Sequence, residues 1–314
     1  MLRSLPLPLP LYLVALLSLP LYVTGVDVRI TTAQDLIDLS EKVLLGTTYA
    51  GTTIFLESDI DFSKLSGNFK PIGDESNDFR GVFDGQGYKI SNLKLNSGSF
   101  RHAGFIGYSQ GGLAVRNLVL DGTCSFSSSK DTTGKSNTFS GGIIGCCDAT
   151  YGPCTSENNV NMAAVSFTGA SGWNMFLGGI VGQFFPDGSN EVIIRNCANY
   201  GAVTFSGSNS HYGHIGGIAG ELSESDFFAE TKKIQNCINY GTITSSGTDG
   251  NRPYVDGIIG ISSKLAIENC VNVGQIEITQ GTDAYAGCIA GFVRSDIEIN
   301  YCHWISGTGY TESI

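Results

Sequence analysis

Short runs of alternating apolar and polar residues dominate this chain, and most runs are bounded by glycine or asparagine. Alternation with a period of two is typical of half-buried β-strands, whereas glycine and asparagine are typical of the turns between them. Around Cys197, for example, Ile194, Val203 and Phe205 form the apolar side of such a pattern. The pattern therefore predicts many short strands joined by tight turns, with very little helix.

A glycine-rich step recurs along the chain at nearly constant intervals. Its six copies close on glycines spaced 38, 37, 38, 40 and 31 residues apart, namely Gly107, Gly145, Gly182, Gly220, Gly260 and Gly291. Self-similarity at a period of roughly 20–50 residues indicates a solenoid, in which each unit buries its apolar face by stacking on the next.

A second phrase, Ile-x-Asn-Cys, follows each of the later steps, as at 194–197, 234–237 and 267–270. Partial copies at 90–93 and 115–118 end in leucine. We interpret one repeat as a glycine-step strand, a variable loop, an Ile-x-Asn-Cys strand and a Gly-x-Val strand. Three strands per coil, stacked strand on strand, predict an all-β fold, a right-handed parallel β-helix.

Stacking would convert the repeated positions into columns. The cysteine column would hold Leu93, Leu118, Asn159, Cys197, Cys237, Cys270 and Cys302. Because leucine shares this column, buried free thiols are the favoured interpretation, with a disulfide inside the column or a metal site as alternatives. The neighbouring asparagines suit turns and amide ladders, and a ladder for a polar ligand is the alternative. Gly201, Gly241 and Gly274 are expected to supply positive φ.

Cys146, Cys147 and Cys154 lie outside this column, in a loop that contains Tyr151-Gly152-Pro153. A local disulfide from Cys154 to one of its two near neighbours is expected, and Cys147 is the partner we favour. No metal site and no cofactor is predicted.

The N-terminal region divides into two parts. Residues 1–25 combine Arg3 with a long apolar run interrupted by prolines, which favours a cleaved signal peptide over a retained membrane anchor. Residues 26–100 are predicted to form a cap and the first coils. Within them, 31–46 has the pattern of an amphipathic helix with Thr31 or Thr32 as N-cap. Residues 101–305 would carry the repeats, and 306–314 a C-terminal tail.

Charge limits the choice of partners. The chain carries 18 Lys+Arg against 29 Asp+Glu, a net charge of −11. An acidic surface argues against nucleic acid as a partner, and no later segment reaches the ~20 apolar residues of a membrane span. We therefore expect a secreted or extracellular-surface protein, a monomer, with an extracellular protein or glycan as ligand.

The glycine steps, together with Thr-Ala-Gln-Asp-Leu at 32–36 and Phe-Asp-Gly-Gln-Gly at 83–87, resemble secreted proteins that carry the GLUG motif. The resemblance covers roughly 28–305. It implies a parallel β-helix on secreted or surface proteins that are frequently adhesin-like, and it implies no catalytic site.

Two functions follow as hypotheses. The first is a non-enzymatic scaffold that binds through its variable loops, where the candidate residues are Trp173, Tyr212, Glu221, Glu224, Asp226 and Tyr254. The alternative is a carbohydrate-active enzyme, a polysaccharide lyase or glycoside hydrolase. Its carboxylates would come from Asp59 and Asp61 or from Glu221, Glu224 and Asp226. Because no convergent catalytic group is evident, no catalytic residue is assigned and the first hypothesis is preferred.

Overall fold

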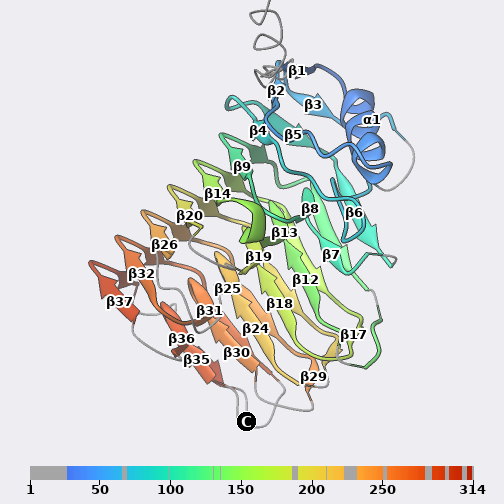
Figure 1. Cartoon of the computed structure of the whole chain (residues 1–314). Helices are drawn as coiled ribbons and strands as arrows, with labels where there is room; N and C mark the ends of the chain where they lie inside the picture. The colour runs from blue at the N-terminus through green and yellow to red at the C-terminus, as the bar shows by residue number, and fades with distance from the viewer. Residues whose placement is uncertain are drawn as a thin grey trace, which may run out of the picture.

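The structure is a computed structural model, and it shows a parallel β-helix capped by one helix at its N-terminal end (Figure 1). It describes residues 27–65, 69–98, 100–129, 131–134, 136–185, 190–209, 211–222, 232–249, 253–279, 285–293, 297–305 and 310–312. Every recorded strand pairing is parallel, and each strand pairs with its counterpart in the next coil. The predicted fold class is confirmed.

Each coil contributes to five long sheets, which we name A to E. Sheet A contains β1 (Val28–Ile30), β2 (Thr53–Leu56), β4 (Val82–Asp84), β9 (Leu113–Arg116), β14 (Cys154–Glu157), β20 (Val192–Arg195), β26 (Lys232–Gln235), β32 (Leu265–Glu268) and β37 (Ile297–Asn300). Sheet B contains β3 (Ile60–Asp61), β5 (Lys89–Ser91), β10 (Val119–Leu120), β15 (Val160–Asn161), β21 (Ala198–Asn199), β27 (Ile238–Asn239), β33 (Val271–Asn272) and β38 (His303–Trp304).

Sheet D contains β6 (Lys94–Ser97), β11 (Ser125–Ser128), β16 (Ala164–Phe167), β22 (Val203–Phe205), β28 (Ile243–Ser245), β34 (Ile276–Ile278) and β39 (Tyr310–Glu312). Sheet E contains β7 (His102–Ala103), β12 (Thr138–Gly141), β18 (Met175–Gly178), β24 (Gly213–Gly216), β30 (Pro253–Asp256) and β35 (Tyr285–Gly287). Sheet C contains β8 (Ile106–Ser109), β13 (Ile144–Asp148), β19 (Val181–Phe185), β25 (Ala219–Leu222), β31 (Ile259–Ser262) and β36 (Ala290–Val293).

Two smaller features complete the secondary structure of the described residues. A short sheet between D and E contains β17 (Ala170–Ser171), β23 (Ser208–Asn209) and β29 (Thr248–Asp249). A single 3-10 turn, η1 (Ala149–Tyr151), follows β13. The strand β39 extends sheet D into the segment predicted as a C-terminal tail.

The prediction of three strands per coil was wrong. The glycine step is a corner that joins a strand of sheet E to a strand of sheet C, as in β18 and β19. The asparagine of Ile-x-Asn-Cys is a second corner, because Asn196 has a φ of 54° and ends sheet A before sheet B begins. Each phrase therefore forms two strands, and at the asparagine corner it is left-handed backbone that interrupts the extended chain.

Two asparagine ladders run along the solenoid, as expected. The outer ladder consists of side-chain amides that each donate to the preceding coil, from Asn269 through Asn236, Asn196 and Asn158 to Asn117. The inner ladder is buried and donates in the opposite direction, from Asn161 through Asn199 and Asn239 to Asn272. Each inner amide also donates to a backbone carbonyl two residues on.

The expected role of the repeated glycines was wrong. Gly201, Gly241 and Gly274 do not have positive φ, which belongs instead to the outer asparagines. A Cβ at Gly241 would overlap the carbonyl oxygen of Gly201 in the preceding coil. Glycine is required here because the backbones of neighbouring coils approach closely.

The cysteine column is confirmed for the later coils, and its members are free thiols. Cys197, Cys237 and Cys270 are buried, and Cys302 is partly buried. Leu93 does not belong to this column, because Ser125 donates its backbone amide to Leu93 and so places Leu93 beside Cys124. The predicted local disulfide joins Cys147 to Cys154, with Cα atoms 6.4 Å apart.

The helix α1 (Ala33–Leu44) covers the first coil, as predicted (Figure 1). Thr32 is its N-cap, and Thr32 and Asp35 form a capping box. Its buried side chains include Leu36, Leu39 and Val43, which join the main core inside the coils. Within the described part of the chain, no helix has the length and apolarity that a bilayer crossing requires.

Candidate ligand-binding site

Sheets E and C meet at the glycine corner, and their outer faces pack against one another outside the main core. One aromatic or histidine side chain per coil lines the outer face of sheet E, in register along the row His102, Phe139, Phe176, His214, Tyr254 and Tyr285. Successive ring centroids lie 4.7–5.6 Å apart. This spacing follows from strand pairing, which places equivalent side chains of adjacent coils in contact.

Polar groups of sheet C face the middle of this row. Glu221 Oε2 lies 3.1 Å from Nδ1 of His214 and accepts a hydrogen bond of 3.1 Å from Gln183. His214 is fully buried, and its Nε2 has no hydrogen-bond partner. A carboxylate at Nδ1 favours a proton on that nitrogen and so orients the imidazole ring. Among the described residues, Glu221 therefore contacts an amide and an imidazole.

The N-terminal end of the row is closed by charged side chains. Arg101 forms an ion pair of 2.9 Å with Glu75, beside the stacked ring of His102. Burial, together with the charge of Arg101, lowers the pKa of His102 to about 3. His102 is therefore neutral at physiological pH and acts as an aromatic side chain in the stack.

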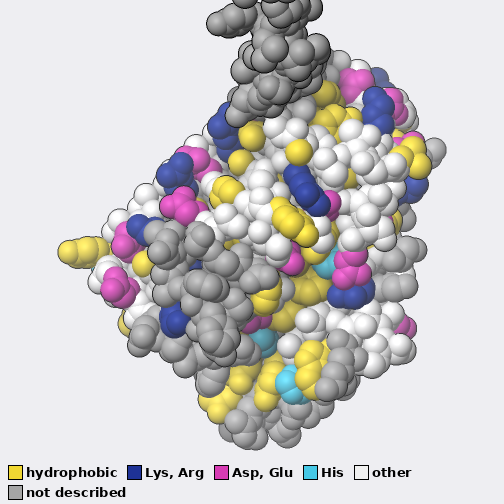
Figure 2. Space-filling model, viewed as in Figure 1, with side chains coloured by type: hydrophobic (Ala, Val, Ile, Leu, Met, Phe, Trp, Pro, Cys, Tyr) yellow, Lys and Arg dark blue, Asp and Glu magenta, His cyan; other side chains and the backbone are white. Residues whose placement is uncertain are grey.

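At the outer edge of sheet E, the half-buried rings of Trp173, His211 and Tyr212 continue from the buried Tyr254 toward the surface. Trp173 stacks on His211 with centroids 3.9 Å apart, and His211 contacts Tyr212 at 4.0 Å. Tyr212 in turn lies 5.8 Å from Tyr254. We call Trp173, His211, Tyr212 and Tyr254 the aromatic strip. Figure 2 shows hydrophobic and histidine side chains gathered over the strands of sheets E and C on this face.

Asn174 holds the aromatic strip in place. Its side-chain oxygen lies 2.9 Å from His211 Nδ1 and accepts the backbone amide of Tyr212 at 3.3 Å. Its own backbone amide donates to Asn137 in the preceding coil. Because both hydrogen bonds of the side chain reach a neighbouring coil, the loops that carry the strip are fixed relative to one another.

Three of the predicted site residues are therefore brought together: Trp173, Tyr212 and Tyr254. Glu221 lies behind them in the buried polar group, while Glu224 and Asp226 fall outside the described residues. Asp59 and Asp61 have structural partners in the cap, since Asp59 accepts the amide of Lys89 and Asp61 accepts Asn92.

Sequence reasoning missed His211, His214 and Tyr285. A signal for the row is nevertheless present, because Phe139, Phe176, His214, Tyr254 and Tyr285 each stand six residues before a closing glycine. Among the described residues, no group of three or more His, Cys, Asp or Glu side chains is placed to hold a metal ion.

Comparison with known proteins supports the fold. No protein-family model matches the chain, and no curated protein matches it significantly. A solved structure from Bacteroides ovatus, described as a "putative immunoglobulin A1 protease", is similar over 90% of this chain and 76% of its own length. The TM-score is 0.64 and the sequence identity 20%. At this identity the similarity establishes a shared architecture and leaves function to the site itself.

Proposed function

We propose that this chain is a secreted or cell-surface, non-enzymatic scaffold that binds an extracellular protein or glycan through the aromatic strip. The observation that carries the proposal is the continuous contact from Trp173 through His211 and Tyr212 to Tyr254. Aromatic side chains provide large, rigid contact areas at low conformational-entropy cost, and they are enriched at binding hot spots. The sheets beneath hold them in fixed register.

Placement outside the cell is supported by the chemistry of the cysteines. The Cys147–Cys154 disulfide requires an oxidising compartment to persist, as disulfides are rare in the cytosol. The apolar segment at residues 1–25 suits export, and the net charge of −11 suits a soluble monomer. An adhesin-like role, as the GLUG resemblance implies, is consistent with these features.

The proposal is tested by binding of the purified mature chain to intact cells and to immobilised glycans. Trp173→Ala combined with Tyr212→Ala should reduce binding at least tenfold. Tyr200→Ala is the matched control, because Tyr200 is an exposed aromatic residue, 49% accessible, on another corner of the coil. Equal binding by both variants and the unchanged chain would reject the aromatic strip as the contact surface.

The alternative is a carbohydrate-active enzyme, and one observation favours it. The contact of His214 with Glu221 orients a buried imidazole whose Nε2 has no hydrogen-bond partner. Cleavage of any acidic or neutral polysaccharide, abolished by Glu221→Gln without loss of folding, would replace the binding proposal with this one.

A further inference from the structure

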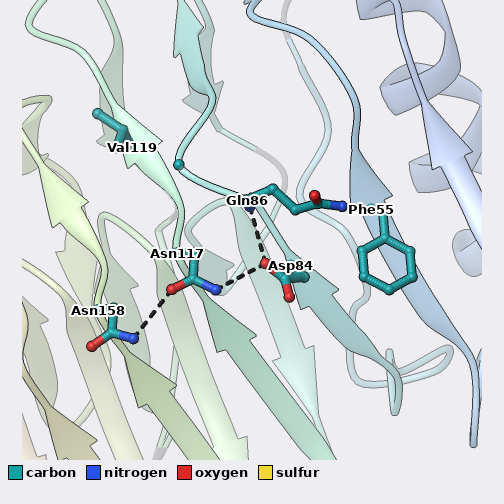
Figure 3. A pocket seen from close by; sticks show the side chains of 7 residues that line it. Phe55, Asp84, Gln86, Asn117, Val119 and Asn158 are labelled. Carbon is teal, nitrogen blue, oxygen red and sulfur yellow. Dashed lines mark hydrogen bonds between the residues drawn. The ribbon is translucent and has the colours of Figure 1, made fainter.

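An open hollow of about 570 Å³ lies where the outer asparagine ladder ends, on the corner between sheets A and B. Its lining residues come from four successive coils and comprise Phe55, Asp84, Gln86, Gly87, Asn117, Val119 and Asn158. Figure 3 shows the amides of Asn158 and Asn117 in line with the Asp84 carboxylate, and Gln86 extending toward Phe55. The hollow is remote in sequence from the aromatic strip and shares no residue with it.

Asp84 anchors this end of the ladder. Its carboxylate accepts the Asn117 side-chain amide at 3.0 Å, the Gln86 backbone amide at 3.0 Å and Arg116 Nε at 2.8 Å. Burial acts to raise its pKa, but the hydrogen bonds from these three partners outweigh burial and lower the pKa. The carboxylate is therefore ionised, and the guanidinium of Arg116 compensates its charge.

The ladder leaves hydrogen-bonding capacity unused at the hollow. A primary amide has two donor hydrogens and two acceptor lone pairs. Asn158 donates once, to Asn117, and accepts once, from Asn196, so one donor and one acceptor remain. The positive φ of Asn158, 54°, directs this exposed side chain outward from the corner. The exposed Gln86 adds another amide at the opposite side of the hollow.

We propose that this hollow, the ladder hollow, binds a neutral saccharide. Each sugar hydroxyl both donates and accepts, which matches amides that retain one donor and one acceptor. The partly buried ring of Phe55 offers an apolar surface for the C–H face of the sugar. An anionic sugar is disfavoured, because the Arg116 guanidinium that pairs with Asp84 beside the hollow is already neutralised.

The test uses two asparagines that are equivalent in the ladder. Asn158 lies at the hollow and Asn236 lies two coils further along, and each makes one donor and one acceptor bond within the ladder. Both have φ of 54°, which glycine adopts freely. Asn158→Gly and Asn236→Gly therefore remove the same ladder bonds and differ in their distance from the hollow.

The full mature chain and its variants are applied to an array of neutral, sialylated and sulfated oligosaccharides, and hits are titrated by calorimetry. We expect binding of neutral oligosaccharides, a loss of at least tenfold for Asn158→Gly and Gln86→Gly, and less than twofold for Asn236→Gly. Trp173→Ala should leave this binding unchanged, which separates the ladder hollow from the aromatic strip. Equal losses for Asn158→Gly and Asn236→Gly, selection of anionic glycans, or binding of peptides alone would overturn the proposal.

Discussion

Asp256 stands in register with Gly216, in a column where a Cβ at Gly178 or Gly216 would overlap a backbone carbonyl oxygen. The column otherwise contains Gly141, Gly178, Gly216 and Gly287. Asp256 is fully buried, and neither carboxylate oxygen has a hydrogen-bond partner. The side chain packs over Gly291 of the next coil, where a Cβ would overlap it.

The buried carboxyl of Asp256 should make the free energy of unfolding depend on pH. Burial raises the pKa of Asp256 well above its usual value, and the nearby amide of Gly287, which is outside hydrogen-bond geometry, offsets this only in part. The folded state therefore holds a proton that the unfolded state releases above about pH 4. The contribution of this carboxyl to stability is complete below that pH and is lost as the pH rises toward the pKa of the folded state. Cys288, the other titratable group beside Asp256, is protonated throughout this range.

Asp256→Gly should accordingly raise the free energy of unfolding at pH 8 by about 2 kcal/mol, because an unpaired buried polar group is removed. Urea unfolding between pH 5 and pH 8.5 measures the effect. Asp256→Asn keeps the shape without the ionisation, so it should flatten the pH dependence as well. An unchanged slope in both variants would contradict this account.

The inner asparagine ladder should be more costly to interrupt than the outer one. Asn199 is fully buried, donates to the Gly201 carbonyl and to Asn239, and accepts from Asn161. Asn199→Ala leaves these buried partners unsatisfied and should cost about 3 kcal/mol. Asn196→Gly, in the exposed outer ladder, should cost about 1 kcal/mol or less. Chemical denaturation of the two variants gives the comparison, and equal costs would be evidence against it.

The close approach of neighbouring backbones at the repeated glycines predicts that alanine is more destabilising there than at an open turn. Gly241→Ala places a methyl group against the Gly201 carbonyl and should destabilise the protein by at least about 2 kcal/mol. Gly87→Ala provides a control, because Gly87 has a φ of 80° and open space around its Cα. Its cost should be limited to backbone strain of about 1 kcal/mol. Thermal unfolding of both variants separates the cost of steric overlap at Gly241 from the cost of backbone strain at Gly87.

The free thiols should react in two classes. Five of the seven free cysteines are buried, and Cys288 and Cys302 are partly accessible. Alkylation of the folded, non-reduced chain should therefore modify at most two sites, and alkylation in denaturant should modify seven. Burial also raises the pKa of both accessible thiols, so their labelling should be slow at neutral pH. Intact-mass spectrometry counts the sites, and labelling of Cys197 in the folded chain would be inconsistent with the column.

The disulfide makes a separate contribution to the free energy of unfolding. Cys147 and Cys154 close a loop with a sequence separation of 7. Restricting an unfolded loop of this size stabilises the folded state by about 2 kcal/mol. Cys147→Ser together with Cys154→Ser should lower stability by that amount, whereas Cys124→Ser, at a buried free thiol, serves as the control for loss of a cysteine.

Sequence alone sufficed to predict the solenoid, its period and the capping helix, and it limited the local disulfide to Cys154 and one of two neighbouring cysteines. These features are local or periodic, so spacing and residue type suffice to reveal them, as Thr32 and Asp35 do for the helix start. Tertiary structure decided the number of strands per coil, because only the backbone angles of residues such as Asn196 show where a corner falls.

Tertiary structure also decided which side chains meet. Trp173, Tyr212 and Tyr254 were selected from separate loops, but their contact depends on the register of adjacent coils and on loops of unequal length. The ladder hollow depends on Asp84, the last acceptor of the outer asparagine ladder. The other end of that ladder, Asn269, lies nearly two hundred residues later in the sequence. The spacing of the repeats can be read along the chain. The surfaces are formed by side chains from different coils, and strand pairing, which a single sequence does not show, decides which of these side chains meet.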